Sequence, residues 1–264
     1  LPIRGQWVRL QSSLHAAGQF RDYPPQASNL LGQMLASVAM IADNLKFSGA
    51  VALQSQGNGA LRRSLAECRD HTNLRGIMHL TDDASFPSSY QDIGAWLGQG
   101  QLAITLLPDE ETGMQPYQGL VTLDQADLTK CLEDYFEHSE QLATRLFFAG
   151  RTKRGADQSV TGLLMQRLPI PPDASDTERD AAQDAWETLT ALAATMTPLI
   201  AESKEIHTSQ IPLHEPLKWE SIERALAIGN ETSQVTLVFF HAEWCGPCRL
   251  VESEILPQLS LIHI

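Results

Sequence analysis

The sequence is poor in cysteine and contains no long apolar run. Four cysteines in 264 residues are too few for the disulfide framework of a small secreted domain. The most apolar helical stretch, residues 30–45, is too short and too polar to cross a bilayer. No charged segment followed by an apolar one opens the chain, as it would in a signal peptide. We therefore expect a cytoplasmic protein without a membrane anchor.

Basic residues are scarce as well. The chain has 19 Lys and Arg against 32 Asp and Glu, which gives a formal net charge of −13. A field of this sign repels phosphate backbones and anionic lipid, so we expect neither nucleic acid nor a membrane as a partner. The apolar fraction of 43% is that of an ordinary globular protein, and a chain of this length can bury a core without disulfides or metals.

Common catalytic motifs are absent from the sequence. It has no Gly-x-Ser-x-Gly elbow, phosphate-binding loop or His-Glu-x-x-His helix, so nothing supports a hydrolase. Gly57-Asn58-Gly59 lacks the third glycine and the following helix of a dinucleotide-binding loop, and we interpret it as a turn. An acidic cluster falls opposite the apolar stripe of its helix, which indicates a solvated helix face rather than a metal site; its members are Glu133, Asp134, Glu137, His138 and Glu140.

Apolar periodicity predicts short strands interleaved irregularly with helices. Residues 29–45 carry apolar side chains at helical spacing over one wide face, which predicts a core helix. The run at 47–53 leads into the turn at 57–59, which predicts a hairpin. Because the strand pairs are hairpin-like and no strand–helix unit repeats, we expect an α+β fold of mainly antiparallel sheet layers with helices. Further strands are expected at 102–107, 117–123, 144–148 and 163–168, and further helices at 127–141 and 177–195.

One motif carries recognisable chemistry, Trp244-Cys245-Gly246-Pro247-Cys248. It follows an apolar run of strand type at 235–240, and it resembles the thioredoxin active site. Two intervening residues at a helix start bring both sulfurs within disulfide reach and lower the pKa of the first thiol, so Cys245 would attack and Cys248 would resolve. Half of a zinc site has the same spacing. Further ligands are hard to find, because Cys68 and Cys131 stand isolated among residues that pack, and we expect both to be buried.

Several segments within residues 1–198 match one family in their residues and in their order along the chain. The most specific is Leu132-Glu-Asp-Tyr-Phe136 followed by Ser139-Glu-Gln141; the others lie at 3–10, 45–49, 54–59, 74–76 and 117–119. These segments resemble the 33 kDa chaperonin family, the redox-regulated heat-shock holdases. The resemblance implies an α+β N-terminal domain, a cytoplasmic location, a homodimer, and ATP-independent capture of unfolded client proteins under oxidative stress.

The chain departs from that family after residue 198. The family ends in a zinc module with a Cys-x-Cys pair followed by a Cys-x-x-Cys pair, and this chain has no Cys-x-Cys, so we expect the family's zinc and redox switch to be absent. We divide the chain into a client-binding domain at 1–198, a linker at 199–216, a truncated thioredoxin-like strand–helix segment at 217–258 and an artefactual tail at 259–264. Because Leu1 opens the chain and the tail resembles a sequencing adaptor, we expect an unnatural N-terminal boundary and a chimeric second part.

Two classes of function compete. The favoured one is a holdase that binds unfolded proteins, with no catalytic residues, no cofactor and no metal. The alternative is a thiol–disulfide oxidoreductase that acts through Cys245 and Cys248 by way of a mixed disulfide. The few residues after Cys248 do not complete a thioredoxin sheet, which counts against the enzyme. An inert globular fragment is the third hypothesis.

We expect the purified protein to hold no stoichiometric zinc. Cys245 and Cys248 offer two thiolates, whereas a structural tetrahedral site takes four ligands. Elemental analysis of the purified chain checks this prediction. One zinc per chain, lost in Cys245→Ser, would overturn it.

Overall fold

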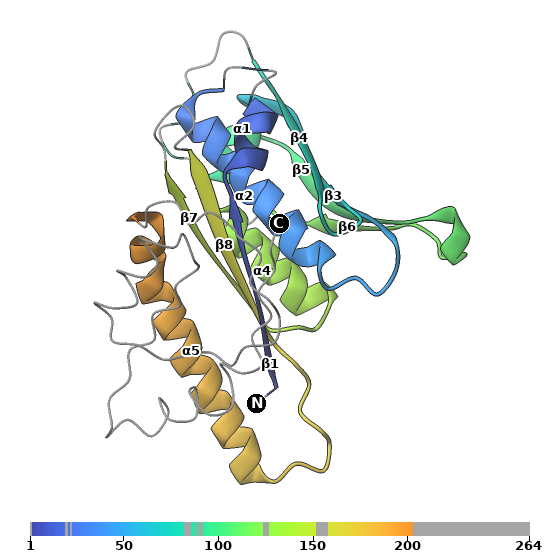
Figure 1. Cartoon of the computed structure of the whole chain (residues 1–264), viewed down its shortest axis with the longest axis vertical. Coiled ribbons are helices and arrows are strands. Elements are labelled where there is room, and N and C mark those ends of the chain that lie inside the picture. Colours follow the sequence, from blue (N-terminus) through green and yellow to red (C-terminus); the bar gives the residue numbers. More distant parts are fainter. Residues whose placement is uncertain are drawn as a thin grey trace.

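Two antiparallel sheets and the helices around them make up the described part of the chain (Figure 1). The computed structural model describes residues 2–18, 21, 23–81, 86–87, 89, 92–123, 127–151 and 158–202. The smaller sheet has the strand order β1-β8-β7 and the larger one β4-β3-β2-β5-β6. The strands are β1 (Ile3–Leu10), β2 (Gly49–Gln56), β3 (Leu61–Arg69), β4 (Asn73–Leu80), β5 (Gln101–Pro108), β6 (Tyr117–Val121), β7 (Thr144–Arg151) and β8 (Ser159–Arg167).

The helix α2 (Pro25–Ala42) lies between the two sheets and is their common core. Pro24 and Pro25 precede and begin it, and every residue from Ala27 to Ala42 is buried. A helix that is buried all round is mainly apolar, and this one, whose buried polar residues are Ser28, Asn29, Gln33 and Ser37, contacts strands of both sheets. The apolar pattern that predicted a core helix here is confirmed.

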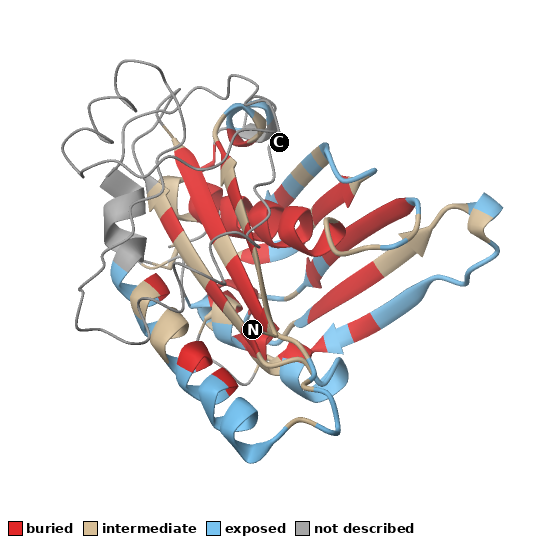
Figure 2. Cartoon of the chain, turned by 60° about the horizontal axis from the view of Figure 1, so that its bottom comes forward, coloured by how far each residue is buried: buried red, intermediate tan, exposed pale blue. Residues whose placement is uncertain are grey.

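Three other helices complete this core, and a fourth builds a second, smaller one. The short helices α1 (Ser12–Gly18) and α3 (Ile93–Leu97) and the longer α4 (Leu128–Ser139) add side chains to the main cluster. The helix α5 (Asp176–Glu202) lies on the opposite face of β7 and β8 (Figures 1 and 2). There Trp186 and Ala193 of α5 pack with Met165 of β8.

The expected α+β fold with antiparallel sheets is confirmed, as are the predicted hairpin at 57–59 and the strands and helices predicted within the described residues. Their ends agree within four residues, except that α5 runs seven residues past its predicted end at 195. The strands β1 and β4 were not predicted. In β1 the buried Gln6 shares a face with Val8 and Leu10, which hides the alternation of apolar and polar residues. In β4 the core-facing row includes Gly76, which lies against Leu31 and Leu35 of α2.

The helix α5 passes residue 198, the predicted end of the first domain, and continues to Glu202. The first residues of the expected linker at 199–216 are therefore helical. The rest of that linker, the thioredoxin-like segment at 217–258 and the tail at 259–264 lie outside the described residues. The division of the chain at these positions stays a prediction.

Gly32 lets α2 approach β8, and this predicts a destabilising alanine variant. A Cβ at position 32 would lie 2.5 Å from Val160 Cγ2 and 3.3 Å from Leu14 Cδ2. Overpacking of this kind costs about 1–3 kcal/mol, which exceeds the gain of about 1 kcal/mol from helix propensity. We expect Gly32→Ala to unfold at a lower urea concentration than the wild type. In a Val160→Ala background the same change should be neutral or stabilising, and an equal loss in both backgrounds would contradict the packing argument.

Candidate functional site

The cysteines of the described part lie in the core and have no place in a redox site. Cys68 and Cys131 are fully buried and no disulfide joins them, which confirms the prediction that both pack as small apolar residues. Burial, reinforced by the charges of Asp70 and Glu67, raises the pKa of the Cys68 thiol to about 12. Because the thiolate is the reactive form, Cys68 is inert at neutral pH. The motif cysteines at 245 and 248 lie outside the described residues.

A zinc site does not fit the residues whose positions are described. Among them no group of three or more His, Cys, Asp or Glu side chains could hold a metal ion. Cys68 belongs to β3 and Cys131 to α4, so the two thiols do not form a ligand pair.

The acidic cluster on α4 is only partly the solvated face that the sequence indicated. Glu137, His138 and Glu140 are exposed and Asp134 is half-buried. Glu133, however, is only 3% exposed, so the prediction was wrong for this residue. The helical spacing placed it opposite the apolar stripe of α4, but β7 packs on that side of the helix and covers it.

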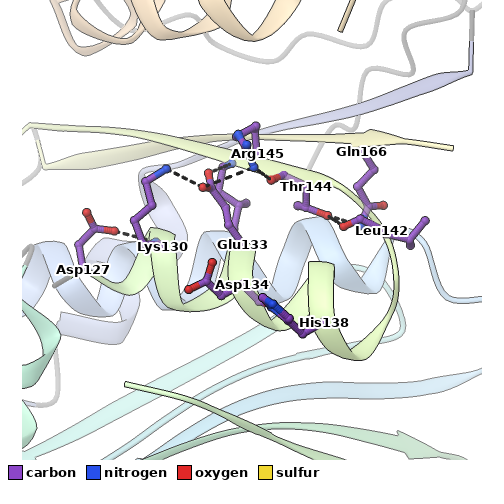
Figure 3. Close-up of polar contacts among 10 residues, drawn as sticks. Asp127, Lys130, Glu133, Asp134, His138, Leu142, Thr144, Arg145 and Gln166 are labelled. Carbon is purple, nitrogen blue, oxygen red and sulfur yellow. Dashed lines mark hydrogen bonds and ion pairs between the residues drawn. The ribbon is translucent and has the colours of Figure 1, made fainter. Parts of the chain in front are cut away.

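Glu133 joins α4 to β7 (Figure 3). Its Oε1 accepts a hydrogen bond from the backbone N–H of Leu146 at 2.8 Å, and its Oε2 pairs with Lys130 Nζ at 2.7 Å and lies 3.9 Å from Arg145. The helix start beside it is capped by Asp127, which accepts from the Lys130 N–H at 2.7 Å. A buried carboxylate is stable only when charges and donors of this kind surround it, so Glu133 is a structural residue.

A tyrosine of α4 makes the corresponding contact with β6. The Tyr135 hydroxyl donates to Glu140 Oε1 at 3.0 Å and lies 3.4 Å from the Tyr117 hydroxyl. Burial first, and then these hydrogen bonds, raise the pKa of Tyr135 well above its usual value. The phenol is therefore uncharged at physiological pH and acts as a polar link rather than as an acid or base.

One cavity lies between the two sheets at the end of α2. It measures about 160 Å³, and its walls are mainly apolar, with Ile41, Ile104 and Phe136 among them. At its edge Arg4 donates to Gln166 Oε1 at 2.5 Å. Sites for drug-sized ligands or nucleotides take roughly 300–1,000 Å³, so this cavity is too small for a nucleotide.

Exposed apolar side chains are the remaining candidate for a functional surface. The large apolar residues with high exposure in the described part are Ile77 (39%), Met114 (51%), Tyr117 (45%) and Leu120 (64%). The last three belong to the hairpin of β5 and β6, residues 101–121, which we call the arm. The arm projects from the body of the molecule beyond the other strands (Figures 1 and 2).

Leu120 and Ile77 lie on the same face of the five-stranded sheet, although they sit on its two opposite edges. The register pairs Leu120 with Ala103, Ala103 with Gln54, Gln54 with Leu65 and Leu65 with Ile77. Paired residues point to the same face, and the core cluster of α1 to α4 lies on the other one. This outer row crosses the whole sheet and is not covered by any described helix.

Comparison with known proteins identifies the family. The model of the family described as Hsp33 protein matches residues 1–223. The chain belongs to the Hsp33 family. It is 33% identical over 222 residues to the 33 kDa chaperonin of Actinobacillus succinogenes, and 36% and 35% identical over 196 and 194 residues to those of Histophilus somni and Haemophilus influenzae. The resemblance that the sequence segments carried is confirmed.

The similarity to Hsp33 proteins includes a solved structure, and it covers part of the length of each relative. The crystal structure of the 33 kDa chaperonin from Thermotoga maritima matches with a TM-score of 0.62 and 19% identity, over 78% of this chain and 68% of that one. The alignments use 81%, 74% and 74% of this chain and span 72%, 63% and 61% of the three relatives. The chain therefore spans about three fifths to three quarters of the curated relatives it matches. No helix among the described residues is long and apolar enough to cross a membrane.

The position of Glu133 predicts a strong effect on stability. In Glu133→Ala the buried N–H of Leu146 loses its acceptor, which costs about 2–3 kcal/mol. Glu133→Gln keeps an acceptor oxygen and should lose about half as much. Urea unfolding checks both values against the exposed control Glu137→Ala, for which we expect a change within about 0.5 kcal/mol. Equal stability of all three variants would show that Glu133 is dispensable.

Proposed function

We propose that this chain is an ATP-independent holdase that binds unfolded proteins through the arm and the outer row of the five-stranded sheet. The observation that carries this proposal is the gathering of Met114, Tyr117 and Leu120 on one projecting hairpin. Exposed apolar side chains that gather on one element mark an interaction site more often than scattered ones do. Unfolded chains expose the apolar segments that such a surface can bind.

Two further observations support binding without chemical turnover. The relatives are named chaperonins. Two of the titratable groups with perturbed pKa values, Cys68 and Tyr135, are held uncharged, mainly by burial. We further propose a cytoplasmic protein that forms a homodimer.

The alternative, a thiol–disulfide oxidoreductase, rests on Cys245 and Cys248 alone. A reduction assay with insulin as substrate separates the two functions. Turnover that is lost in Cys245→Ser would establish the enzyme. A holdase suppresses aggregation in proportion to its concentration and has no turnover.

Replacing Leu120 should weaken the holdase. Leu120→Ser removes the most exposed large apolar side chain of the arm at little cost to stability, since exposed positions change stability by about 0.5 kcal/mol or less. We expect light scattering of a heat-unfolded client to show several-fold lower suppression of aggregation per mole of chaperone. Glu137→Gln, on α4 and remote from the outer row, is the control that should suppress like the wild type. Full activity of both Leu120→Ser and Tyr117→Ser would argue against the arm.

The holdase activity of this chain should not depend on oxidation. The 264 residues contain no Cys-x-Cys pair, so a four-cysteine zinc module of the family's kind is not available to unfold on oxidation. A disulfide between Cys245 and Cys248 would close a very short loop and transmit little free energy. We expect peroxide-treated protein, reduced protein and Cys245→Ser/Cys248→Ser to suppress aggregation equally. Activity that appears only after oxidation and vanishes in the double variant would assign the switch to this motif.

A further inference from the structure

Backbone groups of Gln118 and Leu120 face away from the sheet. In an antiparallel ladder, alternate residues of a strand bond to opposite neighbours. Just beyond β5, the Asp109 N–H donates to the Ser48 carbonyl at 2.9 Å, so odd-numbered residues of β5 bond to β2 and even-numbered ones to β6. Given the register of β5 and β6, residues 117, 119 and 121 bond to β5. The N–H and C=O groups of residues 118 and 120 therefore point to the free edge.

At two other sheet edges a side chain bonds to the backbone of one edge-facing residue. On β4 the Tyr23 hydroxyl accepts from the Met78 N–H at 2.9 Å and donates to the Met78 carbonyl at 3.1 Å. On β7 the Leu146 N–H is held by the buried Glu133. Along β1, the fourth edge, no residue is exposed. A side-chain bond of this kind, or burial of the edge, hinders the addition of another strand.

The edge of β6 has neither protection. No described residue outside β5 forms a hydrogen bond with the backbone of residues 118 or 120, and both residues are exposed. The strand contains no proline and no lysine, the residues that commonly guard edges. Figure 2 shows β6 as a mostly exposed strand at the border of the sheet. Tyr117 and Leu120 place apolar side chains on its two faces.

The charge of the arm indicates what this edge can bind. Residues 101–121 contain Asp109, Glu110 and Glu111 and no Lys or Arg. Asp109 pairs with Arg69 at 2.7 Å, whereas Glu110 and Glu111 are exposed and form no ion pair with a described residue. A segment that carries basic residues beside its apolar ones complements this arm. The same edge of a second copy, which carries the same acidic residues, does not.

We propose that the edge of β6 binds an extended apolar segment with flanking basic residues, taken from an unfolded protein, as an added strand of the sheet. This inference rests on the proposed holdase function and deepens it. The main chain of the segment bonds to the backbone of Gln118 and Leu120, and its alternate side chains lie beside Tyr117 and Leu120. Strand addition depends on hydrogen bonds to backbone groups that every polypeptide has, and this suits a protein that binds many sequences.

A proline at position 118 tests the backbone contact. Gln118→Pro removes an N–H that the native ladder does not use, and edge strands tolerate proline at such positions. Gln118→Ala is the matched variant, since both lose the side-chain bond to Thr105 and only the alanine keeps the N–H. We expect the proline variant to bind a client roughly five- to tenfold more weakly than the alanine variant, with equal thermal unfolding. Equal binding by the two folded variants would overturn the proposal.

Hydrogen exchange with a synthetic peptide tests the site without a client. The probe is a peptide of alternating valine and threonine with lysines at both ends, and the control carries glutamates instead. The lysine peptide should slow exchange at the amides of residues 118 and 120 and leave residues 119 and 121, already bonded to β5, unchanged. No protection at 118 and 120, or equal protection by both peptides, would contradict the inference. This readout also serves if Gln118→Pro fails to fold.

The two measurements separate this inference from the proposed function. Peptide protection without suppression of aggregation would remove the holdase and keep the strand-addition site. Suppression without protection at 118 and 120 would keep the holdase and remove the site. If size-exclusion chromatography shows a dimer that Gln118→Pro dissociates and the lysine peptide does not, the edge pairs with a second copy and the proposal is wrong.

Discussion

The burial of α2 between two sheets is the constraint on which the rest of the structure depends. Because the helix has no solvent face, each sheet must turn one face inward to it, and each sheet then needs something else for its outer face. The smaller sheet receives α5, through Trp186 and Met165. The larger sheet receives no described helix and keeps an open outer row. The burial of α2 thus leaves two outer sheet faces, of which α5 covers one and no described helix covers the other.

The sequence predicts those parts of the fold in which the local pattern and the final environment agree. The mainly apolar α2 and the hairpin around Gly57-Asn58-Gly59 are of this kind, because periodicity and turn chemistry are local properties. The strand β1 was missed because Gln6 occupies a core-facing position and bonds to the distant Asn44. A polar residue in a strand core is recognisable only once its partner, far along the chain, is known.

The sequence did not predict most of the candidate site, because burial and exposure there depend on contacts that are distant along the chain. Helical spacing places Glu133 on a polar face, and only the packing of β7 against α4 buries it. Leu120 has the pattern of an ordinary strand residue, and its exposure follows from its position on the uncovered outer face of the edge strand β6. Family resemblance supplied the function class, but exposure and edge position come from tertiary structure alone.

An open apolar edge can cause self-association, and the net negative charge of this chain opposes it. Edge strands pair with any available strand, including one from another copy. The long-range repulsion of two chains of net charge −13 acts before contact and falls off over roughly 8 Å at physiological ionic strength. A client segment with flanking basic residues is not repelled in this way, so the repulsion disfavours pairing of two copies at this edge without weakening the backbone bonds that hold a client. The excess of acidic residues therefore limits self-association through the unprotected edge of β6.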